Sequence, residues 1–196
     1  MNRKNWLCFT MVVFMVLPLL WVSNSYAVES LKGRGSIGAA LSYQSAVFTV
    51  GSYESETNTT SLQGSIGYFV TDHLEVNFAP VMSASESEAG SSSSESTSYS
   101  YFGNLKYNFY QRGSTTVPFV GLQAGITGYE SDGDTDSAFS YGGMVGVKFF
   151  LTEDISLNLE LNYLQTTFEA QYPATQDTEY EVSSFFAGFS YYFGGE

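Results

Sequence analysis

Four charged residues of this chain fall at polar positions within segments whose side chains alternate between apolar and polar. They are two acids and two bases: Glu75, Lys106, Lys148 and Glu160. Successive side chains of a β-strand point to opposite faces, so each charge is predicted to lie on the face away from the apolar one. Charges on an enclosed face need partners, and we predict pairs between neighbouring strands, Glu75 with Lys106 and Lys148 with Glu160.

A second group with a spacing suited to chemistry is the acidic run at Asp132, Asp134 and Asp136. Alternate aspartates open a calcium-binding loop, in which a glycine follows at the sixth position and a glutamate at the twelfth. Ser137 and Gly143 stand at those two positions here. A solvated acidic loop is therefore the favoured interpretation, and a divalent-cation loop is the alternative.

Eight alternating segments must position these residues. They span residues 33–48, 61–70, 74–82, 99–110, 117–129, 138–151, 155–168 and 184–193. Short turns alternate with longer polar connections, which we place at residues 52–58, 83–98, 130–136 and 169–178. Residues 83–98 are almost wholly Ser, Glu, Ala and Gly, so they are predicted to form a mobile loop.

This rhythm predicts an all-β fold, an eight-stranded antiparallel up-and-down transmembrane β-barrel with short periplasmic turns. Closure pairs the backbone groups of the edge strands, which would otherwise face lipid unpaired. A soluble lipocalin-like barrel, with its apolar face inward, would show the same alternation. The polar faces are rich in Gly, Ser and Asn, which suits a narrow lumen, and Tyr and Phe gather near segment ends, as at membrane interfaces. Both features favour the membrane barrel.

The first 27 residues have the pattern of a secretory signal peptide. A basic start with Arg3 and Lys4 precedes an apolar run over residues 6–22, and Ser25 and Ala27 supply the small residues of a cleavage site. The run is short for a membrane span, so a retained anchor is the less favoured alternative. The predicted organisation is a cleaved signal at residues 1–27 and one barrel domain at residues 28–196.

Charge and cysteine content exclude several classes of partner. The formal net charge of the whole chain is −13, and removal of the signal makes it more negative, which disfavours nucleic acid as a partner. The only cysteine is Cys8, within the predicted signal, so no disulfide scaffold or thiolate metal site is expected. A single histidine, His73, cannot build a zinc site alone. We predict no cofactor and no metal.

The last segment, residues 184–193, places Phe189, Tyr191 and Phe193 on one strand face. These residues resemble the C-terminal assembly signal of bacterial outer-membrane barrels. The signal peptide, the eight segments and this ending together resemble the small barrels typified by the transmembrane domain of outer-membrane protein A and by outer-membrane protein X. The resemblance implies a location in the bacterial outer membrane, with lipid, lipopolysaccharide and the barrel assembly machinery as partners.

The resemblance also bears on catalysis. Small-barrel enzymes that act on lipid A use a histidine, with a serine and an acid, near the outer membrane face. His73 stands in a short turn that is predicted to face the periplasm, on the wrong side for that chemistry. We therefore predict an ordinary turn residue and no catalytic residues.

Two functions remain open. The leading hypothesis is a non-enzymatic barrel whose lumen is plugged by the four charges, as interior charge networks do in the resembling family. Such a protein would stabilise the envelope and display mobile acidic loops for adhesion or contact with a host or surface ligand. The loop acids are also hypothesised to bind lipopolysaccharide through divalent cations. The alternative is a small porin-like channel in which the same charges line an ion path.

Overall fold

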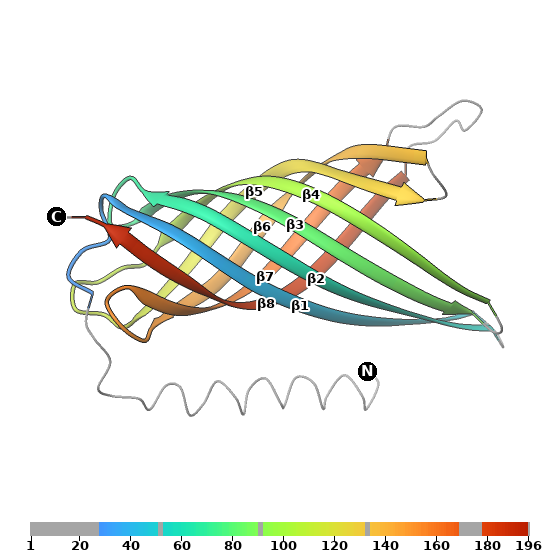
Figure 1. Cartoon of the computed structure of the whole chain (residues 1–196), viewed down its shortest axis with the longest axis horizontal. Helices are drawn as coiled ribbons and strands as arrows, with labels where there is room; N and C mark the ends of the chain where they lie inside the picture. The colour runs from blue at the N-terminus through green and yellow to red at the C-terminus, as the bar shows by residue number, and fades with distance from the viewer. Residues whose placement is uncertain (1–27, 51–52, 90–91, 132–133, 169–177, 196) are drawn as a thin grey trace.

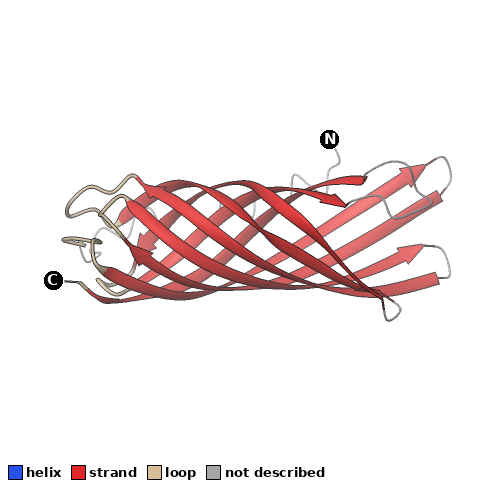
Figure 2. Ribbon diagram, turned by 90° about the horizontal axis from the view of Figure 1, so that it is seen from above, coloured by secondary structure: helices blue, strands red, loops and turns tan. Residues whose placement is uncertain are grey.

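The computed structural model describes residues 28–50, 53–89, 92–131, 134–168 and 178–195, so the signal peptide predicted for residues 1–27 lies outside the described part. The strands are, in order, β1 (Arg34–Val50), β2 (Tyr53–Phe69), β3 (Leu74–Ala89), β4 (Ser92–Asn108), β5 (Thr116–Ser131), β6 (Asp134–Phe150), β7 (Ile155–Phe168) and β8 (Thr178–Gly194). Each strand pairs antiparallel with the next, and β8 pairs with β1, which closes the sheet into a barrel (Figures 1 and 2). The predicted eight-stranded barrel is confirmed. Within the described ranges, no helix is long and apolar enough to cross a membrane.

The apolar faces of the strands point outward. On β7, Leu161 and Tyr163 are 51% and 44% exposed, whereas Glu160 and Asn162 are 7% and 4% exposed. The other strands alternate in the same sense, with polar side chains buried inside the barrel. A soluble barrel would bury its apolar face, because the hydrophobic effect opposes such exposure to water. The outward orientation predicted from the sequence is confirmed, and the lipocalin-like alternative is wrong.

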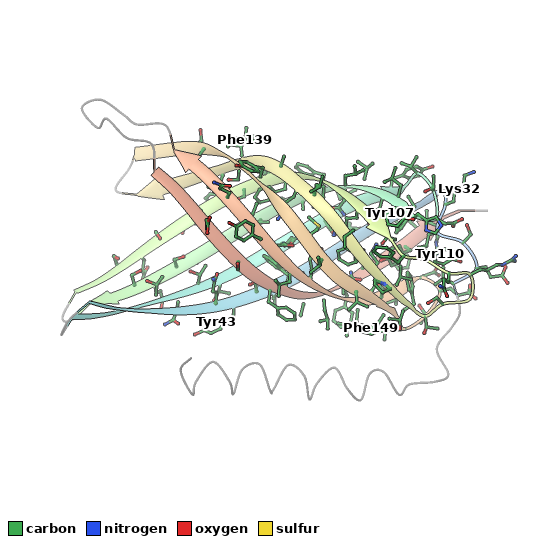
Figure 3. All side chains as sticks on the ribbon, turned by 180° about the vertical axis from the view of Figure 1, so that it is seen from behind. Lys32, Tyr43, Tyr107, Tyr110, Phe139 and Phe149 are labelled. Atoms are coloured by element: carbon green, nitrogen blue, oxygen red, sulfur yellow. The ribbon has the colours of Figure 1, made fainter. Side chains whose placement is uncertain are left out.

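Exposed aromatic side chains lie toward both ends of the apolar surface. In Figure 3, Tyr107 lies near the end that carries the tight turns, whereas Tyr43 and Phe139 lie farther along the barrel. All three side chains are exposed. Aromatic belts of this kind mark the two interfaces of a membrane barrel, so the apolar surface between them is the lipid-facing band.

The prediction of a mobile loop at residues 83–98 is wrong, because β3 continues to Ala89 and β4 begins at Ser92. Hydroxyl groups bond across β2 and β3 at three successive inward positions: Ser61 with Ser83 at 2.8 Å, Thr59 with Ser85 at 2.8 Å and Thr57 with Ser87 at 3.0 Å. Cross-strand hydrogen bonds stabilise a ladder without apolar packing. A composition of Ser, Glu, Ala and Gly indicates disorder when the segment is considered alone. The hydroxyl groups of β2 that lie opposite and bond these serines stand elsewhere in the sequence, so the composition does not reveal them.

Two further outer connections are also shorter than predicted, whereas the connection predicted at residues 169–178 agrees with the end of β7 at Phe168 and the start of β8 at Thr178. β1 runs to Val50 before β2 begins at Tyr53, and β5 runs to Ser131 before β6 begins at Asp134. A strand of 17 residues, such as β2, is about 55 Å long at ~3.3 Å per residue. With a tilt of ~40° it rises about 40 Å, against an apolar band of ~25 Å. The strands therefore continue well beyond the membrane on the side away from the turns.

The barrel wall divides at this outer end. Within the described residues, β1 and β8 pair from Arg34–Gly194 to Leu41–Ala187, although both strands continue outward. Figure 1 shows β1–β4 diverging from β5–β8 there. A hydrogen bond spans the division, because Gln44 Nε2 donates to the Ser183 carbonyl oxygen at 2.9 Å. The outer end is thus an open cup between two half-sheets.

Candidate functional site: the barrel lumen

The four predicted lumen charges meet inside the barrel, in a group that we name the charge layer (Glu75, Lys106, Lys148 and Glu160). Lys148 Nζ lies 2.5 Å from Glu75 Oε2, and both side chains are 4% exposed. Lys106 Nζ lies 2.6 Å from Glu160 Oε2, and these side chains are 9% and 8% exposed. Removing an ion from water costs several kcal/mol, so charges buried this deeply depend on their partners.

The predicted pairing between neighbouring strands is wrong. Glu75 lies opposite Lys106 in the ladder of β3 and β4, but its carboxylate binds Lys148 of β6. Lys106 binds Glu160 of β7 in the same manner, so each ion pair crosses the lumen and skips two strands. Inward side chains of a narrow eight-stranded barrel converge on its axis, where groups from facing walls meet. Strand register alone does not reveal these contacts.

Aromatic rings complete the charge layer. The ammonium groups of Lys106 and Lys148 lie 4.8 Å and 5.5 Å from the centre of the Phe119 ring, and Lys148 Nζ also lies 4.6 Å from the centre of the Phe69 ring. Each cation–π contact contributes about 0.5–2 kcal/mol, more when desolvated. The lysine positions are therefore fixed by rings as well as by carboxylates.

Glycines make room for this arrangement. A Cβ atom at Gly67 would lie 3.0 Å from Glu75 Oε1, and one at Gly146 would collide with the Phe119 ring. Their absent side chains allow a carboxylate and a ring to lie across the lumen. The hollow that remains around the charge layer measures about 40 Å³. That space holds only a few water molecules.

A second obstruction lies at the end that carries the turns. We name it the turn-end cluster, and its buried members are Val28, Leu31, Phe69, Tyr110, Val117, Phe150 and Tyr192. The Tyr192 ring centre lies 5.2 Å from that of Phe150 and 6.0 Å from that of Phe69. Val28 and Leu31 come from the segment that precedes β1, so this segment packs against the inward rings at the turn end of the barrel (Figure 1). This cluster was not predicted from the sequence, although Phe69 and Tyr192 stand at inward positions of their strands.

Hydrogen bonds hold the segment of residues 28–33 in place. Asp72, in the turn between β2 and β3, accepts bonds from Ser30 Oγ at 2.8 Å, Leu31 N at 2.7 Å and Lys32 N at 3.0 Å. Burial raises the pKa of Asp72, but the bonds from Lys32, Ser30 and Leu31 outweigh it, so the pKa lies below its ordinary value. The ionised carboxylate is therefore the form that binds the segment.

The same segment is fastened on its other side. Tyr110 Oη donates to the Val28 carbonyl oxygen at 2.7 Å, and Gly113 N donates to the same oxygen at 3.1 Å. At the start of β1, Arg34 Nη1 donates to the Glu153 carbonyl oxygen at 2.7 Å, and Arg34 also pairs with Asp154. The segment is thus tied to the β2–β3 and β4–β5 connections, and the adjoining Arg34 of β1 is tied to the β6–β7 connection.

On the outer side of the charge layer the lumen widens into a hollow of about 490 Å³, which we name the outer vestibule. Serine and threonine are the commonest residues of its lining. A chain of hydroxyl bonds runs along one wall from Ser100 through Thr127 and Ser140 to Thr166, with distances of 3.0, 2.9 and 2.7 Å. Glu181 is the one ionisable residue that the described part of the chain contributes to the lining.

Three amide side chains at the vestibule have unused polar atoms. Gln63 Oε1, Gln123 Nε2 and Asn162 Oδ1 are buried, and none has a hydrogen-bond partner among the described residues. The three side chains belong to the vestibule lining, and their residues are 7%, 6% and 4% exposed. A buried polar atom without a partner costs about 1–3 kcal/mol. The alternation of apolar and polar residues in SLQGSIGYFV, VPFVGLQAGITGY and ISLNLELNYL places Gln63, Gln123 and Asn162 on polar faces, but it does not indicate that their amides lack partners.

The residues of the predicted assembly signal lie on the lipid face of β8. Phe189, Tyr191 and Phe193 are exposed and stand beside β1, where the barrel closes. Phe193 lies opposite Gly35, and a Cβ atom at Gly35 would come within 2.6 Å of its ring. The ring thus covers the glycine at the closing pair of strands. Its role as an assembly signal stays a prediction.

The remaining candidates are spread over the two ends. Asp134 and Asp136 lie at the start of β6, two residues apart on a strand rather than in the predicted loop, and Asp132 lies outside the described residues. Within the described part of the chain, no cluster of three or more His, Cys, Asp or Glu lies close enough to hold a metal ion. The divalent-cation loop stays a prediction. His73 lies in the β2–β3 turn, stacked on Tyr107 with ring centres 5.6 Å apart.

A protein-family model matches most of the chain. This model, described as "Outer membrane protein beta-barrel domain", matches residues 13–193. The chain belongs to this family. Its members are barrels of the bacterial outer membrane, which is where this protein is located. Members and structural neighbours of the family are generally non-enzymatic.

Three solved structures share the fold of this chain. OprG from Pseudomonas aeruginosa has a TM-score of 0.54 and 15% identity, with 86% of this chain and 100% of that chain covered. Neisserial surface protein A has a TM-score of 0.57 and 17% identity, with coverage of 82% and 97%. The N-terminal β-barrel domain of Pseudomonas aeruginosa OprF has a TM-score of 0.52 and 18% identity, with coverage of 83% and 98%. No curated protein sequence matches the chain.

Proposed function

We propose that this protein is a non-enzymatic, non-conducting barrel that stabilises the outer membrane and displays its outer strands to the exterior. The observation that carries the proposal is the double obstruction of the lumen, by the charge layer and by the turn-end cluster. An ion crossing the barrel would have to separate two buried ion pairs and then displace the packed rings of Phe69, Phe150 and Tyr192. At eight strands the interior is just wide enough for side chains to fill it.

The outer strands support the second part of the proposal. Outward positions beyond the apolar band carry polar side chains, and Asn58, Glu86 and Glu95 stand side by side on β2, β3 and β4. We propose that the polar hairpin formed by the outer parts of β3 and β4, residues 84–97, contacts a host cell or another surface ligand. Lipopolysaccharide and outer-membrane lipid are the partners of the band below it, and the barrel assembly machinery is the partner during insertion.

Conductance tests the closed lumen. The refolded protein is placed in a planar bilayer beside Lys106→Ala and Glu160→Ala, with Gln165→Ala as an outward-facing control. Because the lumen is obstructed at two levels, we expect the wild-type protein to show no single-channel current. Steady openings that change in the two lumen variants but not in the control would establish the alternative, a small channel for ions or solutes, and overturn the proposal.

Removal of the hairpin tests the display. Residues 84–97 can be replaced by a two-residue Asn-Gly turn between the paired positions Ser83 and Ser98 on β3 and β4. We expect the shortened barrel to refold and insert, since the deleted part lies beyond the apolar band, and bacteria carrying it to adhere less to host cells. Unchanged adhesion at equal surface abundance would refute the display role while leaving the closed lumen in place.

A further inference from the structure

We propose that the outer vestibule is a binding site for a small neutral hydroxylated solute, of the size of a mono- or disaccharide, that arrives from the cell exterior. The vestibule measures about 490 Å³, within the ~300–1,000 Å³ range that small-molecule sites occupy. Its floor is the charge layer, so the solute would be held and not passed on. The site therefore goes beyond the proposed function and needs no open lumen.

The unused amide atoms indicate what kind of ligand the vestibule takes. Gln63 Oε1 and Asn162 Oδ1 are acceptors and Gln123 Nε2 is a donor, and all three belong to residues that are more than nine-tenths buried. A hydroxyl group both donates and accepts a hydrogen bond, so a polyol in the vestibule satisfies acceptors and donors at one site once the amide groups, whose unused atoms are closed to water in the empty barrel, rotate toward it. The ladder and chain hydroxyls are already bonded to one another, whereas these amides are not.

Apolar surface beside the amides matches a sugar ring. Phe102 and Phe186 belong to the same lining, and Phe186 lies on the boundary with the charge layer. A pyranose ring carries C–H groups on its faces and hydroxyl groups at its edge. Ligand sites generally combine an apolar lining with a few placed polar groups, and this lining has both.

The vestibule presents no free charge to an ion. Glu181 borders the hollow, but it stands opposite Gln165, whose side chain lies on the outer face, so its carboxylate points away from the vestibule. The four charged side chains of the charge layer, which forms the floor of the vestibule, are already paired, so they offer no unpaired charge to a ligand. Hydroxyl and amide groups alone are a poor cation site, because hard cations take several oxygen ligands that include carboxylates. A neutral ligand fits this set of groups.

The divided wall gives access. Beyond the pair Leu41–Ala187 the described parts of β1 and β8 no longer pair with each other, so the vestibule opens between the two half-sheets as well as upward. Gln44 spans this division through its bond to Ser183 and also belongs to the vestibule lining. A solute can therefore enter without any movement of the membrane-embedded part of the barrel.

Nuclear magnetic resonance of the refolded, isotope-labelled barrel in micelles tests the site. Maltose is titrated while the side-chain amide signals of Gln63, Gln123 and Asn162 are followed. We expect these signals to move along one saturating curve, with a dissociation constant on the order of millimolar. Gln123→Leu and Asn162→Leu should each weaken binding by about tenfold, which corresponds to the loss of one hydrogen bond.

Matched controls separate the site from general effects. Gln165 and Asn58 lie on the outer face, where they accept bonds from Tyr141 and Tyr43, so Gln165→Leu and Asn58→Leu should leave binding unchanged. Without sugar, Asn162→Leu should not lower the urea midpoint of unfolding, since the lost Oδ1 had no partner. A lower midpoint would show a structural role for the amide and count against the proposal. Absence of saturation, equal binding by Gln123→Leu, or tighter binding of the anion glucuronate than of maltose would overturn it.

Discussion

Replacement of Lys148 by methionine tests whether the charge layer is a set of mutually dependent ion pairs. Methionine keeps the unbranched stem that packs near Phe69 and Phe119, so the substitution removes the charge with little loss of volume. Glu75 then remains as a carboxylate whose side chain is 4% exposed, without the ammonium group 2.5 Å away. Breaking a buried ion pair by removing one partner costs about 3–5 kcal/mol, and we expect Lys148→Met to lie in this range.

The double variant Glu75→Gln, Lys148→Met isolates the interaction. Glutamine retains the size and the hydrogen-bonding capacity of Glu75 but leaves no charge to compensate. The double variant should therefore cost much less than the sum of the two single changes, which gives a coupling energy of about 3 kcal/mol or more. Replacing a complete buried pair by neutral side chains is often close to neutral in stability.

The assay is urea unfolding of the barrel in lipid vesicles, followed by tyrosine fluorescence and far-ultraviolet circular dichroism. Both tryptophans, Trp6 and Trp21, lie within the predicted signal, so tyrosine is the reporter in the processed chain. Single variants that cost less than about 1 kcal/mol, the value of an exposed pair, would refute the buried pairing. A double variant as unstable as the sum of the two single variants would refute the coupling.

Three further predictions concern the turns, the wall and the C-terminus. Because the pKa of Asp72 is lowered, its carboxylate holds residues 28–33 fully at pH values above 3.8, its ordinary pKa, and this contribution is lost as the pH falls through the lowered pKa. Amide chemical shifts of residues 28–33 followed against pH check this, and Asp72→Asn should abolish the transition. Gly142→Ala should destabilise the barrel by about 1–3 kcal/mol in urea unfolding, because a Cβ atom there would collide with the Tyr163 carbonyl oxygen, whereas Gly143→Ala, with its nearest atom 3.6 Å away, should cost far less. Phe193→Ala should slow membrane insertion in a vesicle-folding assay, and unchanged insertion with and without the assembly machinery would argue against an assembly signal.

The strand count, the closure and the sidedness of the barrel could be predicted from the sequence because they depend on a period of two within each segment. Residues 155–168 illustrate this, since the alternation predicts the bounds of β7. The outer half could not be predicted in the same way. Beyond the lipid, outward side chains no longer need to be apolar, so the alternation fades while the ladder continues through hydroxyl pairs such as Thr59 with Ser85.

The site residues divide along the same physical boundary. Burial of Glu75, Lys106, Lys148 and Glu160 follows from their position in the alternation, but the choice of partner depends on distances across the lumen, which strand order does not contain. The turn-end cluster depends on a segment outside every strand. A signal was nevertheless present, because aromatic residues at inward positions of a narrow barrel indicate that something packs against them.

The contacts of residues 28–33 also bear on the order of assembly. The segment bonds to the β2–β3 turn through Asp72 and to the β4–β5 connection through Gly113, and it packs on Tyr192 of β8. These groups are distant in sequence, and Tyr192 reaches the segment only when β8 pairs with β1. Ordering the segment costs conformational entropy, which the contacts can offset only when they form together. We therefore expect the segment to dock after barrel closure, so that the lumen is obstructed at its turn end as the last step of folding.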